Sequence, residues 1–211
     1  MSVYQDWITQ IPSYITSDIN IMYNKGNATF TIKFYKFKRE QIIEASIFKN
    51  IGNPTITSCK GYYSKVTDCW VNLDTGLSQP FSKMKSIMIF DKNIEDDYLS
   101  IYTNSINILL EKQHNIVFQY NFTQMGGKSK EGGGCYFPRE SLIALSIFCT
   151  WEENNLTYFC QSFTTEQYNN LVPYTSEYVF PNMIDYELED FMNSYYGDNK
   201  AKLVNIILNT I

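Results

Sequence analysis

Residues 115–164 read NIVFQYNFTQ MGGKSKEGGG CYFPRESLIA LSIFCTWEEN NLTYFCQSFT, and this stretch decides the fold. Apolar and polar side chains alternate along residues 115–123, which predicts a half-buried strand. In residues 142–151 both faces are apolar, which predicts a strand that is covered on both sides. The glycine-rich run between them predicts a flexible loop. We therefore expect an antiparallel sheet around these two strands.

The end of the stretch predicts a hairpin. Residues 154–155 are both Asn, which tolerates the positive φ of a two-residue turn, so residues 156–163 would return as a strand. Trp151 would then face Tyr158, and Cys149 would face Cys160. Opposed thiols could oxidise, but two buried free cysteines are the expectation in a reducing compartment.

The rest of the chain predicts mostly short strands. After a turn signal at residues 24–27, residues 28–38 alternate cleanly. Further strands are expected at residues 55–65, 67–73, 85–90, 98–103 and 106–110. Residues 41–48 fit either a helix stripe or a strand, and a strand is favoured. Turn-like compositions separate most of them, which favours a barrel or sandwich over βαβ units.

Helices are expected at the two ends of the chain. Residues 2–11 have capping-box spacing and an apolar stripe. Residues 164–182 predict a long connection, and residues 184–195 and 200–209 predict two closing helices. The length of 211 residues fits one domain, with a β core at residues 28–163 and the connection and helices at residues 164–211.

Composition limits the function. The net charge of −5 lacks the positive field that nucleic-acid binding needs. No secretory signal or membrane span is visible, so we expect a soluble protein in the cytoplasm or inside an organelle. Five cysteines without a CxxC pair predict reduced thiols. The aromatic share of 16% exceeds what a core can hold, so some Tyr side chains should line pocket walls or partner surfaces.

The motifs that suggest chemistry fail on inspection. A phosphate loop ending at Lys128 needs a glycine where Phe122 stands. A thiol nucleophile at Cys135 would need His114, the single histidine, which lies at the far end of the preceding strand. Arg139 is the more interesting residue, because it either pairs with a nearby glutamate or holds an anionic ligand group at a pocket mouth.

The order of elements resembles the lipocalin-like, or calycin, barrels. The resemblance rests on a short N-terminal helix with Trp7, a run of strands, the hairpin of residues 145–163 with Trp151, and a C-terminal helix. Members of this group carry small apolar ligands, and one branch comprises the chromophore lyases that deliver bilins. The resemblance implies a closed barrel around a ligand cavity.

The sequence thus predicts a mainly β protein, an antiparallel barrel or curved sheet with short terminal helices. The expected function is non-catalytic binding of an apolar or aromatic small molecule in an aromatic-lined cavity. The expected lining residues are Phe118, Tyr120, Arg139, Phe148, Trp151 and Tyr158. We expect no metal and no cofactor other than a bilin-like or similar apolar ligand.

Two alternatives remain open. One is a protein-interaction module, a viral or cellular factor that presents a Tyr-rich surface to a protein partner. The other is an enzyme similar to the chromophore lyases, which would need a polar cluster around Arg139. The oligomeric state is open.

Overall fold

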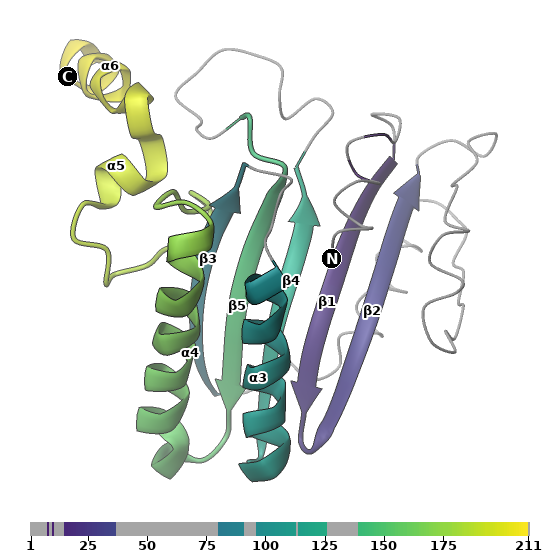
Figure 1. Ribbon diagram of the computed structural model, residues 1–211. Helices are drawn as coiled ribbons and strands as arrows, with labels where there is room; N and C mark the ends of the chain where they lie inside the picture. The colour runs from purple at the N-terminus through teal and green to yellow at the C-terminus, as the bar shows by residue number, and fades with distance from the viewer. Residues whose placement is uncertain are drawn as a thin grey trace.

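The computed structural model describes residues 8, 10, 15–36, 80–90, 96–112, 114–125 and 139–210. The strands are β1 (Ile15–Asn24), β2 (Asn27–Lys36), β3 (Phe81–Ile89), β4 (Ile116–Gln124) and β5 (Ile143–Trp151). They form one antiparallel sheet in the order β2-β1-β4-β5-β3 (Figure 1). β2 and β3 lie at its two ends, so the sheet of the described strands is open and does not close into a barrel.

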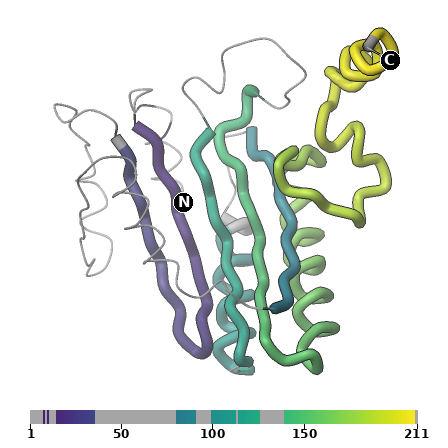
Figure 2. Tube along the Cα trace, turned by 180° about the vertical axis from the view of Figure 1, so that it is seen from behind, coloured from purple at the N-terminus to yellow at the C-terminus, as the bar shows by residue number. Residues whose placement is uncertain are grey.

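Two long helices cover one face of the sheet. They are α3 (Asp96–Lys112) and α4 (Thr157–Leu171), and both lie in front of the strands in Figure 1. The view from behind shows the strands nearer the viewer and the same helices beyond them (Figure 2). The fold is therefore a mixed α and β fold, with one layer of strands and one layer of helices. The predicted antiparallel sheet is confirmed, but the described strands do not form a barrel.

The core lies between this sheet face and the helices. Its largest fully buried side chains on the strands are aromatic: Tyr23, Phe118, Tyr120, Phe122 and Trp151. They belong to alternate positions of β1, β4 and β5, because successive side chains of a strand point to opposite faces. The rings pack edge to face, as in the 4.5 Å centroid distance between Tyr102 of α3 and Tyr120.

The three strands that the sequence shows most clearly are confirmed. β4 and β5 match residues 115–123 and 142–151, and β5 is buried along its length apart from the half-buried Phe148. β2 follows a tight turn in which Lys25 and Gly26 both take positive φ, 47° and 92°. Such a turn matches the twist of the strands that it joins, so β1 and β2 form a regular hairpin.

Two predicted strands are wrong, because residues 98–103 and 106–110 belong to α3. The buried residues of this helix, Tyr102, Ser105, Ile106 and Leu109, recur at the spacing of one helix face. Residues 103–105 have a turn composition, yet the Ser105 hydroxyl donates to the carbonyl of Tyr102 inside the helix at 2.8 Å. Short apolar runs do not separate helix from strand, and here the helical period prevails.

The predicted hairpin after β5 is also wrong. Residues 154–156 form a 3-10 turn, and residues 157–171 form α4. Trp151 Nε1 donates to Thr157 Oγ1 at 2.9 Å, so this Trp fastens the first turn of the helix to the end of the strand. Cys160 still lies beside Cys149, but it reaches it from the helix above the sheet, and both thiols are free and buried.

The C-terminal part differs in detail from its prediction. α4 occupies the first half of the expected connection, and only α5 (Phe191–Tyr196) of the expected helix at residues 184–195 is helical. α6 (Lys200–Thr210) confirms the last helix, and short 3-10 turns η4 (Val172–Tyr174) and η5 (Gly197–Asn199) link these elements. β1 was not predicted at all.

Several predicted segments lie outside the described residues. They are the strands at 41–48, 55–65 and 67–73, the glycine-rich loop, and most of the helix at 2–11, of which Ile8 and Gln10 are described as helical.

A pair of phenylalanine substitutions tests where the core lies. Phe118→Ala removes a fully buried ring and should lower the free energy of unfolding by about 3–5 kcal/mol, through lost burial and the cavity left behind. Phe30→Ala, on β2 and 51% exposed, should cost less than about 1 kcal/mol. Urea denaturation of both variants measures the difference, and equal losses would contradict this placement of the core.

Candidate functional site

The sheet face opposite the helices is the polar one. The hydroxyl of Tyr120 lies 3.0 Å from Ser105 of α3 and 3.2 Å from Gln167 of α4, so this ring points toward the helices. Its neighbours Gln119 and Asn121 therefore point to the opposite face. The same alternation places Asn20 of β1 on that face, because it pairs with Asn121.

Two rows of side chains cross this face in register. One row is polar and consists of Asn20, Asn121, Ser146 and Ser86 on β1, β4, β5 and β3. The adjacent row is mostly apolar and consists of Met22, Gln119, Phe148 and Met84. Asn20 Nδ2 donates to Gln119 Oε1 at 2.9 Å, which links the two rows across the β1–β4 pair. We call these eight residues the amide face.

The amide face is covered unevenly. Asn20, Asn121 and Gln119 are half-buried, whereas Ser146 and Ser86 are 6% and 3% exposed. At the β3 end the cover comes from the C-terminal segment, because the Phe180 amide donates to Ser86 Oγ at 3.0 Å. Contact with another molecule is therefore easiest over β1 and β4, where the amide side chains lie.

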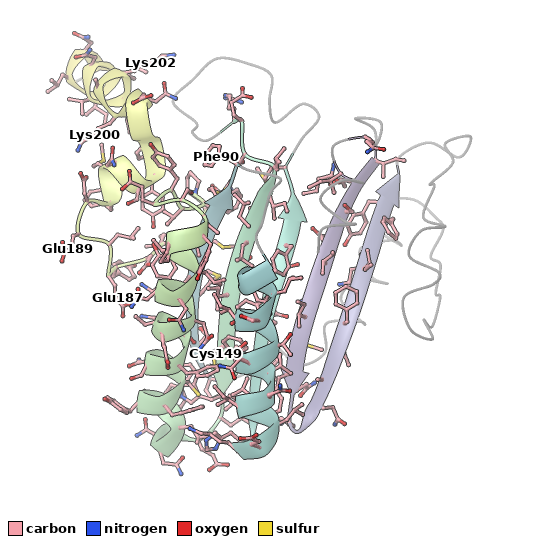
Figure 3. All side chains as sticks on the ribbon, viewed as in Figure 1. Phe90, Cys149, Glu187, Glu189, Lys200 and Lys202 are labelled. Atoms are coloured by element: carbon pink, nitrogen blue, oxygen red, sulfur yellow. The ribbon has the colours of Figure 1, made fainter. Side chains whose placement is uncertain are left out.

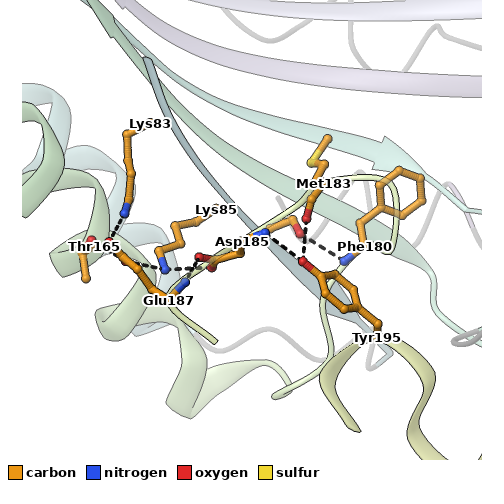
Figure 4. A network of polar contacts seen from close by, with 9 residues as sticks. Lys83, Lys85, Thr165, Phe180, Met183, Asp185, Glu187 and Tyr195 are labelled. Carbon is orange, nitrogen blue, oxygen red and sulfur yellow. Dashed lines mark hydrogen bonds and ion pairs between the residues drawn. The ribbon is translucent and has the colours of Figure 1, made fainter. Parts of the chain in front are cut away.

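The C-terminal segment is fixed to β3 by a buried ion pair. Lys85 Nζ lies 2.7 Å from a carboxylate oxygen of Asp185 and 2.7 Å from one of Glu187 (Figure 4). Glu187 also pairs with Lys83, which lies two residues before Lys85 on β3. The side chains of Lys85 and Asp185 are only 3% and 6% exposed. Burial lowers the pKa of Lys85, but its bonds to both carboxylates outweigh burial and leave the pKa raised, so the amine is charged.

Tyr195 of α5 completes this anchor. Its hydroxyl accepts a hydrogen bond from the Asp185 amide at 2.8 Å and donates to the Met183 carbonyl at 3.0 Å (Figure 4). On the strand side, the Met88 amide donates to the Tyr178 carbonyl at 2.8 Å. The segment after α4 therefore caps the edge of β3 through charges and backbone hydrogen bonds. This anchor is structural, since its polar groups satisfy one another.

The six expected lining residues do not come together. Phe118, Tyr120 and Trp151 lie in the core beneath the helices, whereas Phe148 lies on the amide face. Tyr158 is 83% exposed on α4. Arg139 is half-buried in the turn before β5, away from the sheet centre. Aromatic residues on one strand were assigned to one cavity, but strand alternation sends them to different faces.

The cysteines and the histidine take structural places. Cys149 lies between β5 and α4 (Figure 3). Its hydrogen bond with Cys160, together with burial, raises the pKa of the Cys149 thiol far above its ordinary value, which leaves it a poor nucleophile. His114 packs its ring against Phe159 at 4.5 Å, and the proposed partner Cys135 lies outside the described residues.

Sequence reasoning missed both the anchor and the amide face. Lys83 and Lys85 recur two residues apart in a strand that carries no other charge, which is a signal for cations on one face that need acidic partners. Asn20 was missed because β1 was missed. Within the described residues, no group of three or more His, Cys, Asp or Glu side chains could hold a metal ion. The described helices include none that is long and apolar enough to cross a membrane.

The fold matches solved oxidoreductase structures. It superposes on the wild-type BBE-like 1 protein of Physcomitrella patens with a TM-score of 0.71 and 17% identity, over 96% of this chain and 46% of that one. A glycopeptide hexose oxidase in complex with teicoplanin superposes with a TM-score of 0.73 and 13% identity, over 96% of this chain and 47% of that one. The berberine bridge enzyme from Eschscholzia californica superposes with a TM-score of 0.65 and 9% identity, over 97% of this chain and 47% of that one.

The likeness is one of fold. This chain spans about half the length of each of these proteins. No protein-family model and no curated protein sequence matches it.

These findings correct the expected kinship and function. The resemblance to lipocalin-like barrels is wrong, because the described sheet is open, helices cover one face, and the matching structures are oxidoreductases. Non-catalytic binding of an apolar ligand in a barrel cavity is contradicted for the same reasons, and so is a bilin-like ligand. Neither the Tyr-rich interaction module nor the lyase is favoured.

Substitution of Lys85 tests the buried anchor. Lys85→Met leaves the Asp185 carboxylate buried without its cation and should lower the free energy of unfolding by about 3–5 kcal/mol. The matched change Lys83→Met, at a more exposed lysine whose partner Glu187 is half exposed, should cost about 1 kcal/mol or less. Chemical denaturation at neutral pH compares them, and similar small losses would show that the Lys85 pair is not a fixed anchor.

The acidic side of the anchor predicts a pH dependence. Bonds from Lys83 and then Lys85 lower the pKa of Glu187 from 4.5 to about 2. A lowered pKa in the folded state stabilises the fold above pH 4.5, and this contribution is lost as the pH falls toward 2. Glu187→Gln should therefore be less stable than the wild type at pH 7, by about 1 kcal/mol or less for a half-exposed group. The two should converge near pH 2.

Glu189→Gln is the control for this experiment. Glu189 lies on the outside of the same segment (Figure 3), so its substitution should leave the pH profile of stability unchanged. A Glu187→Gln defect that persists at low pH would contradict an ionic origin.

Proposed function

We propose that this chain is one half of a flavin-dependent oxidoreductase, and that the amide face forms a wall of its active site. The observation that carries the proposal is the superposition of nearly the whole chain on about half of several oxidoreductases. We infer that the cofactor of such an oxidoreductase is a flavin. The remaining half would come from another polypeptide or from more of the same one.

The amide face fits the ring system of a flavin. An isoalloxazine has a polar pyrimidine edge with N–H and C=O groups, and an apolar benzenoid end. Asn20, Gln119 and Asn121 carry amides that can donate to and accept from such an edge. Met22 and Phe148, in the adjacent row, offer a polarisable and an aromatic surface for the apolar end. A planar ligand could therefore lie across the two rows.

The same face does not fit the phosphates of FAD. Lys33 is the one lysine that the described strands carry on this side, and it stands opposite Asp18 in the β1–β2 register. A pyrophosphate needs several donors or a helix N-terminus that points at it. The described strands offer neither on this face. We infer that the phosphates are held outside the described strands of this chain.

The chemistry then divides between the cofactor and this chain. When bound, a flavin accepts two electrons and a proton from the substrate. The amides of Asn20 and Gln119 are already fixed to each other, so they can hold a polar ring edge without losing much side-chain freedom. The wall of helices behind the sheet is solid, which keeps water from reaching a ligand through the sheet.

Flavin content tests the proposal. We expect the protein isolated from its own cells to carry flavin, with absorbance near 450 nm and about one flavin per chain. Gln119→Leu with Asn121→Leu removes two hydrogen-bonding side chains and should reduce retained flavin about tenfold after gel filtration. Thr29→Val, at the exposed outer end of the same face, is the control and should retain it. A protein that never carries flavin would contradict the proposal.

A further inference from the structure

α6 presents an apolar surface that the described structure leaves uncovered. In this helix of 11 residues, Val204, Ile206, Ile207 and Leu208 are 38%, 50%, 47% and 69% exposed. At ~100° per residue, its apolar side chains cover about 200° of the circumference, twice the stripe of an ordinary surface helix. A helix of this kind is normally buried on more than one side. Some other surface therefore has to cover it.

α6 also stands apart from the rest of the fold. Both views place it beyond the end of the sheet, on the side of β3 (Figures 1 and 2). Among the described elements, the ones that it contacts most are η5 and α5. Phe191 of α5 is itself 53% exposed, so the apolar surface continues from one helix to the next. Exposed apolar surface of this kind marks a contact with another protein surface or with a membrane.

We propose that α6 is the docking helix for the flavin-holding half of the enzyme. This inference rests on the proposed function. The matching oxidoreductases are about twice as long as this chain, although they cover at least 96% of it, so each carries a further half that this chain does not match. That half is a body large enough to bury a helix of this size. Two domains in contact each bury a patch of their surface, and the exposed apolar side of α6 offers such a patch.

Two other occupants fit less well. A membrane surface attracts helices whose polar face is rich in Lys and Arg, but the net charge here is −5, and the polar residues of α6 are two Lys, two Asn and one Thr. Of its two lysines, Lys200 is paired with Asp190 at 3.3 Å. A second copy of this chain could cover the helix, but it would not supply the phosphate site that the amide face lacks.

Charge placed on the two sides of α6 tests the proposal. The test variant is Ile207→Glu with Leu208→Glu, which places two carboxylates in the proposed contact. The matched control is Asn205→Glu with Asn209→Glu, which adds the same charge to the polar side. Because all four side chains are exposed, both variants should melt within about 2 °C of the wild type. A large loss in the test variant would show that α6 is buried within this chain and would overturn the proposal.

Retained flavin after gel filtration is the second readout, with protein from its own cells. We expect the test variant to lose flavin at least tenfold, while the control and wild type keep it. If all three retain flavin equally, the enzyme half exists but α6 does not dock it, so only this inference fails. If the wild type carries none, the proposed function fails first. A homodimer that the test variant dissociates, or binding to anionic vesicles, would assign α6 to a different occupant and overturn the inference.

Discussion

β5 is buried on both of its faces, and the two faces need different covers. On one side, α3 and α4 seal an aromatic core against it. On the other, its side chains Ser146 and Phe148 belong to a polar surface that the C-terminal segment covers only near β3. A central strand of this kind is stable only when material lies above and below it. The helices and the anchored C-terminal segment therefore both follow from one strand.

Sequence patterns predicted most of the strands in which apolar and polar residues alternate. They failed where an apolar run fits both the period of a strand and the period of a helix. In α3, residues 103–105 read as a turn between two apolar runs, yet Ser105 faces inward and meets the Tyr120 hydroxyl. Only the partner strand reveals why a polar residue stands on the buried side of the helix. β1 failed in the same way, because Ser17 interrupts the apolar side of its alternation. Its hydroxyl donates to Gln124 at 2.8 Å, a contact that no local pattern contains.

The site was less predictable than the fold because its parts are remote in the chain. Asn20 and Gln119 are 99 positions apart, and Lys85 and Asp185 are 100 apart. Gln119 and Asn121 could be assigned to the polar side of a strand, but nothing local showed that other amides would align beside them. The buried charge of Lys85 also guards an edge strand, since it draws the C-terminal segment over backbone groups that would otherwise be open to pairing with another chain.

The strand order has a consequence during synthesis. β1 pairs with β2, which follows it directly in the chain. Its other neighbour in the sheet, β4, is synthesised about a hundred residues later. Sheets with such remote pairing fold slowly, and an isolated hairpin is only marginally stable. During that interval one side of the hairpin shows apolar residues, and the other shows Thr31, Asn20 and their polar neighbours. The side chains that later form the amide face thus give the unfinished hairpin one polar side.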